Sequence, residues 1–311
     1  MVEYKYWIAL ENSKGIGLAG LTEIYNTITS LNISLFDIFS LNEEELRGEF
    51  VFNDKIFAGI LEAQSNLEIM EEPYFDIIEA GIRTVMFFES DYPEKIKTSL
   101  KNLAPPILYF LGNNKLLNMP SSALLGQSDI SPVGEAAAYL CAKELVRHNI
   151  CVLSGLTKKI GVTVHRSAVE NAGSTIGILP SGFLKFKMSD RLKEVFLNDR
   201  FLLLSCFNPL ADFSSFNAII RNRLICALAD TVFILEAPAE EGIFEAAKSA
   251  TKLQKPLFTL KYEKFPETAK ENPKLISDYG AFPIDIKKDG NISAAGIESI
   301  VSKTLAVSNR F

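Results

Sequence analysis

The pattern of hydrophobic and polar positions divides the chain into two parts. From residue 4 to about residue 72, apolar side chains recur every three or four residues, as Leu18, Leu21, Ile24, Tyr25 and Ile28 do. This spacing predicts amphipathic helices. From about residue 80, short apolar runs alternate with amphipathic segments. That alternation is typical of strands joined by crossover helices, so a small helical module followed by an α/β domain is predicted.

The second part contains the elements of a parallel sheet. Strands are predicted at residues 83–88, 107–111, 122–126, 150–154, 175–179, 201–205, 231–236 and 256–260. Helices are predicted at residues 134–148, 160–172, 189–197, 214–229 and 241–254. Crossover connections of this kind place helices on both faces of the sheet. Near-continuous apolar strands such as residues 231–235 fit a sheet that is buried on both sides.

Three segments follow from these patterns. We expect a helical domain at 1–78, an α/β domain at 79–286 and a short polar tail at 287–311, in which residues 296–305 can form one helix. The segment Ser40–Glu45 has the composition of a capped helix start. Gly15 and Gly17 form a turn ahead of a helix, which is either a tight interhelical turn or the phosphate-holding hairpin of a helix-hairpin-helix module.

Composition narrows the class of protein. Of the 311 residues, 48% are hydrophobic and 23% are charged, as in ordinary globular proteins. No apolar run is long enough to cross a bilayer and the N-terminus lacks a signal-peptide core, so a cytoplasmic protein without membrane contact is expected. The four cysteines lie in apolar surroundings and only two histidines occur, which predicts buried thiols and no metal site or cofactor. The net charge of −6 argues against a nonspecific nucleic-acid coat but leaves room for a local basic groove.

Small residues follow two of the predicted strands. Gly126 and Ser128 come after the strand at 122–126, and Ser154 and Gly155 end the strand at 150–154. Ligands of open parallel sheets bind at the carboxyl ends of the strands, where glycine permits close approach and the next helix points free amides at an anion. Glycine after a strand is also ordinary turn chemistry.

Basic residues lie at the start of the next predicted helix. Lys158 and Lys159 precede it, where an anion between them would offset the unfavourable helix dipole, although solvated surface lysines would look the same. His165 falls within that helix and either contacts a ligand or packs in the core.

The tripeptide Arg221-Asn222-Arg223 is the most informative feature. Neighbouring residues do not share a helix face, so one arginine can meet a ligand while the other meets a structural carboxylate. Guanidinium groups suit phosphate oxygens. Phe213 and Phe216 lie just upstream, and we expect them in the core unless one of them stacks on a base.

Acidic residues lie near the same edge of the predicted sheet. Glu236 ends a strand, and Glu240 and Glu241 open the next helix, which makes that rim unfavourable for phosphate. No nucleophile has an adjacent base and no carboxylates have clear catalytic spacing. The sequence therefore predicts a binding protein rather than an enzyme, with no catalytic residues.

Several segments together resemble the DNA-processing protein A (DprA/Smf) family over residues 5–285. The entry segment is similar at Asp91-Tyr92-Pro93, Pro105–Tyr109 and Gly112-Asn113. The central signature is similar at Val152–Leu156, His165 and Gly173–Ile176. The most specific motif matches at Arg221–Ile225, followed by Glu236-Ala237 and Gly242.

The resemblance implies a SAM-like or helix-hairpin-helix-like N-terminal module and an extended Rossmann-like domain. It also implies a dimer that binds single-stranded DNA and passes it to a RecA-type recombinase. By resemblance, Lys158, Arg221 and Arg223 would contact DNA, and Gly126 and Gly155 would shape the floor of the site. Together with the residues considered above, the candidate DNA- or phosphate-binding set is Gly126, Ser128, Ser154, Gly155, Lys158, Lys159, His165, Arg221, Asn222 and Arg223.

The chain departs from the family pattern at three places. Gly126-Gln127-Ser128 stands where the family has glycine-serine-arginine, and Thr157–Gly161 stands where it has alanine-arginine-glycine-isoleucine-aspartate. Glu241-Gly242-Ile243 replaces serine-glycine-serine. The apolar strands are intact, so we expect the fold to persist and the pocket to differ.

Three functions remain open from the sequence. The leading hypothesis is a divergent DprA-like protein that binds single-stranded DNA in recombination, transformation or phage defence. The alternative is a nucleotide-binding regulator, or an antitoxin-like partner, built on the same fold with an altered pocket. A third is a scaffold whose pocket no longer takes a ligand.

Overall fold

The structure is a computed structural model that describes residues 4–126, 129–188, 193, 199–238, 241–287 and 289–309. The chain divides into two compact units. The first comprises Met1–Phe110, Ser181–Lys185 and Cys206–Asp212, and the second comprises Leu111–Pro180, Phe186–Ser205 and Phe213–Phe311. Within the described ranges, no helix has the length and apolar character needed to span a membrane.

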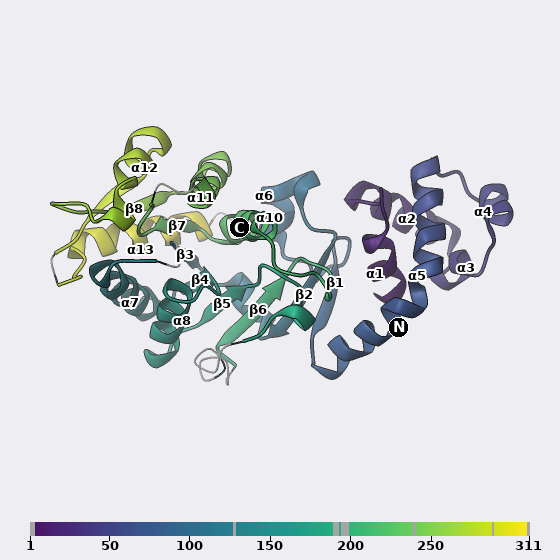
Figure 1. Cartoon of the computed structure of the whole chain (residues 1–311), viewed down its shortest axis with the longest axis horizontal. Coiled ribbons are helices and arrows are strands. Elements are labelled where there is room, and N and C mark those ends of the chain that lie inside the picture. The colour runs from purple at the N-terminus through teal and green to yellow at the C-terminus, as the bar shows by residue number, and fades with distance from the viewer. Residues whose placement is uncertain are drawn as a thin grey trace. The chain divides into compact units, whose positions relative to one another are not determined.

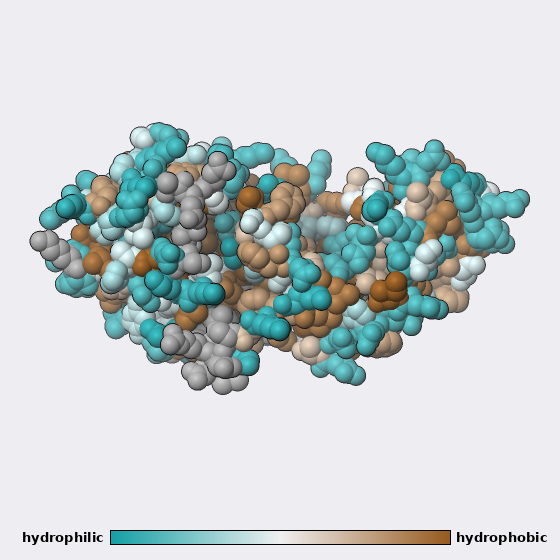
Figure 2. Space-filling view, viewed as in Figure 1, coloured by the Kyte–Doolittle hydropathy of each residue, from teal (hydrophilic) through white to brown (hydrophobic). Residues whose placement is uncertain are grey.

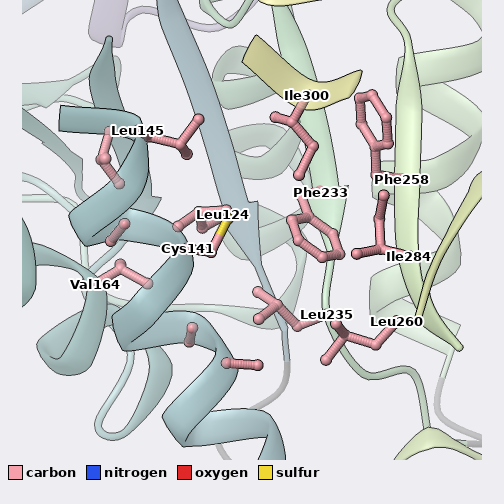
Figure 3. Close-up of a cluster of buried hydrophobic side chains, with 14 of the residues drawn as sticks. Leu124, Cys141, Leu145, Val164, Phe233, Leu235, Phe258, Leu260, Ile284 and Ile300 are labelled. Atoms are coloured by element: carbon pink, nitrogen blue, oxygen red, sulfur yellow. The ribbon is translucent and has the colours of Figure 1, made fainter. Parts of the chain in front are cut away.

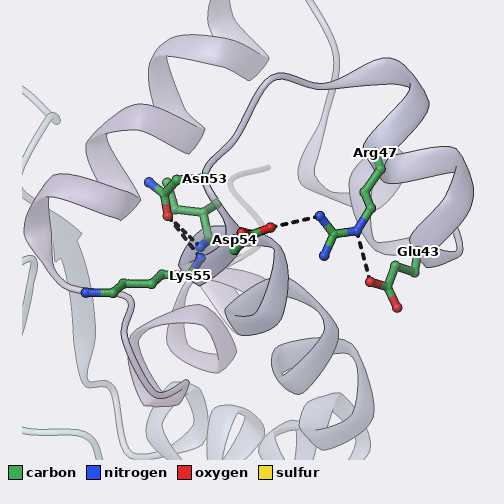
Figure 4. Close-up of polar contacts among 6 residues, drawn as sticks. Glu43, Arg47, Asn53, Asp54 and Lys55 are labelled. Carbon is green, nitrogen blue, oxygen red and sulfur yellow. Dashed lines mark hydrogen bonds and ion pairs between the residues drawn. The ribbon is translucent and has the colours of Figure 1, made fainter.

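The first unit begins with five helices, as the three-and-four spacing predicts (Figure 1). They are α1 (Tyr4–Asn12), α2 (Leu18–Leu31), α3 (Leu35–Phe39), α4 (Glu43–Glu49) and α5 (Asp54–Glu79). The predicted capped start at residues 40–45 is confirmed, because Asn42 and Glu45 form a reciprocal capping box at the start of α4. Figure 4 shows Arg47 between Glu43 and Asp54, where it ties α4 to the first turn of α5.

The first unit continues beyond the predicted boundary at residue 78. It includes β1 (Arg83–Met86), α6 (Glu94–Leu100), the 3-10 turns η1 (Lys101–Leu103) and η3 (Phe183–Lys185), and most of β2 (Ile107–Gly112). Side-chain hydrogen bonds join α1 to this segment, from Tyr4 to Glu89 (2.9 Å) and from Tyr109 to Glu11 (3.3 Å). The strands β1 and β2 are antiparallel, whereas the sequence pattern predicted only parallel pairing.

The second unit is built on a parallel sheet. Its described strands pair in the order β6-β5-β4-β3-β7-β8-β9, all in parallel. They are β3 (Ser121–Leu125), β4 (Cys151–Gly155), β5 (Thr175–Ile178), β6 (Phe201–Ser205), β7 (Thr231–Ile234), β8 (Leu257–Lys261) and β9 (Phe282–Asp285). The six predicted strands of this region are confirmed to within a few residues. The pattern missed β9, whose side chains are mostly exposed.

Helices cover both faces of this sheet (Figure 1). On one face lie α7 (Pro132–Arg147), α8 (Ile160–Glu170) and α13 (Ala294–Ser308), and on the other lie α10 (Ser215–Leu228), α11 (Glu241–Lys252) and α12 (Asn272–Tyr279). The turns η2 (Asn114–Asn118) and η4 (Glu267–Ala269) complete the unit. The predicted helix at 189–197 falls almost wholly outside the described residues.

The core of the second unit includes a residue of the predicted polar tail. Leu124 and Phe233 from the sheet meet Cys141 of α7, Val164 of α8 and Ile300 of α13, all of them buried (Figure 3). Each buried side chain of this size contributes on the order of 1.5–3 kcal/mol through the hydrophobic effect. The helix predicted at residues 296–305 is therefore confirmed as part of α13, and its buried face packs in the core of the second unit.

A buried amide joins the carboxyl ends of β7 and β8. Asn272 is fully buried at the start of α12. Its Nδ2 donates to the carbonyl oxygens of Leu235 and Leu260, each at 2.8 Å, and its Oδ1 accepts from the Ala237 amide at 2.8 Å. One side chain thus satisfies three backbone groups that water does not reach.

We predict that Asn272→Ala lowers the free energy of unfolding by about 3 kcal/mol or more. Each buried backbone group left without a partner costs about 1–3 kcal/mol. Urea unfolding measures the change. The matched control is Ser277→Ala, on an exposed position of the same helix, which should change stability by less than about 0.5 kcal/mol. Equal stabilities of the two variants would contradict the role assigned to Asn272.

Candidate nucleic-acid interface

The parallel register brings the carboxyl ends of the central strands to one edge of the sheet. Gly155 at the end of β4 pairs with Ile178 of β5, and Leu125 of β3, just before Gly126, pairs with Ile234 of β7. Ligands bind at this edge of open parallel sheets. The small residues at 126 and 155 therefore lie where the sequence placed them.

Arg221 of α10 reaches the end of β4. A methyl group on Gly155 would overlap Nη1 of Arg221 and lie 2.6 Å from its Cζ. Glycine at 155 is thus needed for the guanidinium to lie against the backbone of the strand end. Two residues that are 66 positions apart in the sequence form the centre of the site.

The Arg221 guanidinium is buried and has no counter-ion among the described residues. The side chain is 8% exposed, and burial lowers its pKa to about 10, so it stays charged at neutral pH. In the described part of the chain, its Nε has no hydrogen-bond partner, and none of the ion pairs there includes Arg221. A desolvated, unneutralised cation is costly unless an anion meets it, so this position suits a phosphate.

Two further cations lie in the loop after Gly155. Lys158 and Lys159 are exposed and immediately precede α8, which begins at Ile160. Lys159 makes a 3.7 Å ion pair with Asp129, and both side chains are largely exposed, so the pair adds little stability. The first turn of α8 is partly capped from within, because Thr157 Oγ1 accepts from the Gly161 amide (3.0 Å).

The rest of the arginine motif lies on α10, and two aromatic residues lie at or just before its start. Asn222 and Arg223 are half-buried, and they face other directions from Arg221. Phe213 and Phe216 are 65% and 69% exposed. The expectation that these rings lie in the core is wrong, and they remain available to stack on a planar group. Figure 2 shows hydrophobic atoms among hydrophilic ones on one face of the molecule.

Two candidate residues lie beneath the site rather than in it. Ser154 is buried, and its hydroxyl donates to the Leu124 carbonyl at 2.7 Å, so it joins β4 to β3. His165 is fully buried, and its Nδ1 lies 2.6 Å from Thr175 Oγ1. Burial lowers the pKa of His165 to about 3, with an opposing effect from a hydrogen bond to the Gly155 backbone. Neither side chain is exposed to a ligand, and His165 supports Gly155 from behind.

The other strand end is filled by the chain itself. Gly126 is half-buried, and Gln127 and Ser128 lie outside the described residues. Glu236, after β7, is 1% exposed and accepts from the amide and hydroxyl of Ser131 at 2.9 and 2.5 Å. Of the acidic rim predicted from the sequence, Glu236 is a carboxylate bound to the start of α7, whereas Glu240 and the side chain of Glu241 lie outside the described residues. Ser131 and Tyr262 were not predicted, although Ser131-Pro132 is a recognisable helix start.

The contacts of the turn at residues 13–17 favour a tight interhelical turn over a phosphate-holding hairpin. The Lys14 amide donates to Glu62 Oε2 at 2.9 Å, so a carboxylate of α5 already binds this amide of the turn. Ile16 is buried against Gly59 of α5. The turn therefore packs α1 and α2 onto α5.

No metal-binding group was found in the described ranges: three or more His, Cys, Asp or Glu side chains do not come together there. All four cysteines are buried, and none forms a disulfide. Burial raises the pKa of the Cys226 thiol to about 12, which keeps it protonated and unreactive. The site consists of cations, small residues and exposed rings.

The fold and this edge define a Rossmann-like protein with a guanidinium at the sheet's ligand-binding end. Residues 83–292 match the family model described as DNA recombination-mediator protein A. This match covers more than half of the chain. The chain belongs to that family, as the resemblance of its motifs indicated.

Individual relatives agree with this membership. The chain is 27% identical over 251 residues to the DNA processing protein DprA of Streptococcus pneumoniae, covering 74% of this chain and 88% of that protein. It is 24% identical over 264 residues to the protein Smf of Synechocystis, covering 83% of this chain and 64% of that protein.

Two solved structures share the fold. The X-ray structure of DprA from Streptococcus pneumoniae matches 96% of this chain and 98% of its own, with a TM-score of 0.72 and 20% identity. DNA processing protein A from Helicobacter pylori, whose structure addresses its single-stranded DNA binding mode, matches 72% of this chain and 96% of its own, with a TM-score of 0.58 and 24% identity.

We predict that His165 makes the stability depend on pH. Its pKa is about 3 in the folded protein and near 6.5 when unfolded, so the unfolded state binds the extra proton between these values. The contribution of neutral His165 to the free energy of unfolding should therefore be fully present above about pH 6.5. Below that pH it should fall by up to about 1.4 kcal/mol per pH unit. Urea titrations between pH 7 and pH 4 should show a shallower dependence for His165→Gln than for the wild type. The exposed His148, changed to Gln, is the control and should keep the wild-type slope.

Proposed function

We propose that the protein binds single-stranded DNA, with phosphates held at the carboxyl edge of the second unit's sheet. Arg221 against Gly155 is the centre of this site, and Arg223, Lys158 and Lys159 add charge around it. The single observation that carries the proposal is that the Arg221 guanidinium is buried and forms no ion pair among the described residues. Membership in the DNA recombination-mediator family and the fold shared with the Helicobacter pylori protein support it.

The charge distribution supports one localised binding site rather than nonspecific nucleic-acid binding over the whole surface. The whole chain carries a net charge of −6, so binding must depend on the field at one surface. Arg221 keeps its charge at neutral pH and has little water around it, which strengthens its attraction to a phosphate relative to an exposed lysine. The exposed Lys158 and Lys159 extend the positive electrostatic potential along the loop after Gly155.

The exposed aromatic rings support a single strand over a duplex. Phe213 and Phe216 stand at the start of α10, five or more residues before Arg221 in the same segment. A single strand can turn its bases onto such rings, whereas paired bases in a duplex are already stacked. Phosphate contacts at the guanidinium and base contacts at the rings would together hold the strand.

We propose the wider role from the same family membership. The protein would act as a homodimer in DNA processing during recombination or transformation, and it would hand the strand to a RecA-type recombinase without catalysing a reaction itself. Light scattering on the purified protein tests the dimer, and a mass of one chain, 34.5 kDa, would exclude it. The nucleotide-binding alternative has less support, because Glu236 fills the start of α7.

We predict that the arginines and the phenylalanines contribute to binding in different ways. Arg221→Ala or Arg223→Ala should weaken the affinity for a labelled oligothymidine and flatten its salt dependence by about 0.7 in the slope for each phosphate that is no longer neutralised. Phe213→Ala or Phe216→Ala should lower the affinity by about 1–3 kcal/mol per stacked base and leave that slope nearly unchanged. Fluorescence anisotropy over a salt series measures both quantities.

Two matched controls separate these effects from nonspecific consequences of removing a charge or an aromatic ring. Arg166→Ala removes an equal charge from the exposed face of α8, where Arg166 lies 3.6 Å from Glu170. Phe36→Ala removes an exposed ring from the first unit. Both should bind as the wild type does. Weak binding with a flat salt dependence that ignores Arg221 and Arg223 would refute the proposed site.

A further inference from the structure

The start of α7 offers the other anion-binding position at this edge of the sheet, and the chain's own carboxylate fills it. Glu236 accepts hydrogen bonds from the Ser131 amide (2.9 Å), the Ser131 hydroxyl (2.5 Å) and the Tyr262 hydroxyl. Ser131 is also the N-cap of the 16-residue α7. The carboxylate therefore takes two donors at the positive end of a long helix and a third from Tyr262 after β8.

The first turn of α7 is shaped around this carboxylate. A methyl group on Gly134 would overlap Oε1 of Glu236 and lie 2.6 Å from its Cδ. Glu236 is 1% exposed, and the pKa of Tyr262 is raised by burial and by its hydrogen bond to Glu236. We call Ser131, Gly134 and Tyr262 the α7 cradle.

Glu236 is held in the α7 cradle from its backbone. Asn272 binds the carbonyl oxygen of Leu235 on one side of Glu236 and the amide of Ala237 on the other. The side chain is therefore aimed at α7 by a buried contact on each side. Since the carboxylate is already fixed before a ligand arrives, DNA binding loses no further conformational entropy of this side chain.

We propose that Glu236 is a built-in anion that determines ligand specificity. It occupies the α7 cradle permanently and repels phosphate from it, so that a ligand phosphate is directed to the site centred on Arg221 and Gly155. A mononucleotide that would bind through a phosphate at the start of α7 is thereby excluded. This exclusion depends on the α7 cradle, and only the advantage that it gives to DNA binding rests on the proposed function.

The test is removal of the carboxylate by Glu236→Ala, followed by thermal unfolding with sodium acetate or inorganic phosphate against sodium chloride at equal ionic strength. Acetate supplies the missing group, and phosphate is the anion said to be excluded. Each should raise the Tm of the variant by about 3–6 °C at ten times its Kd, beyond any shift of the wild type. Taking the difference from the wild type removes any effect of phosphate bound at Arg221.

The control variant is Glu263→Ala, which removes an exposed acid next to Tyr262 and leaves the α7 cradle filled. It should respond to the anions as the wild type does. An unchanged Tm of Glu236→Ala in both anions overturns the proposal. Stabilisation by acetate without phosphate also overturns it, because size rather than Glu236 would then exclude phosphate.

Folding failure of Glu236→Ala does not block the test. If the variant is unfolded in chloride, refolding from urea in acetate or phosphate replaces the Tm measurement. Recovery in both anions supports the proposal, and recovery in neither or in acetate alone overturns it. Oligothymidine binding of the wild type is measured on the same samples, so failure of the proposed function would be seen separately from the behaviour of the α7 cradle.

Discussion

The contact between the Arg221 guanidinium and the backbone of Gly155 is the interaction on which the site depends. It requires a glycine at the end of β4, because any side chain there would overlap the guanidinium. It also requires α10 to pack against the sheet so that Arg221 is buried while it remains charged. Ser154 and His165 serve this contact indirectly, one by joining β4 to β3 and the other by supporting Gly155 from the core.

The two helices that follow β3 and β4 use their N-termini differently. The start of α7 is neutralised by Glu236, a buried acid from the same unit. The start of α8 carries Lys158 and Lys159, and among the described side chains the hydroxyl of Thr157 is its cap. Adjacent strand ends thus present opposite charges within one edge, and the overall charge of −6 says little about either of them.

The sequence predicted what depends on local periodicity. Apolar runs such as residues 231–235 predicted the buried strands, and the arginine motif with its preceding glycines predicted where the candidate site lies. Exposure of Phe213 and Phe216 could not be predicted, because aromatic residues at helical spacing usually lie in a core. Asn272 is 36 residues from Glu236 and carries no sequence signal, since its role arises only when β7 and β8 are paired.

Thr157, which lies in a segment that departs from the family pattern, and Glu236, which matches it, have a common physical consequence at this edge. With Thr157 capping Gly161 from within, one amide of α8 is already satisfied. With Glu236 in place, the donors of Ser131 at α7 are satisfied as well. A phosphate arriving at the sheet therefore finds few unsatisfied backbone donors among the described residues, and a guanidinium fork offers the strongest remaining interaction. Because that fork lies in a poorly hydrated position, one arginine can supply attraction that several solvated lysines would otherwise share.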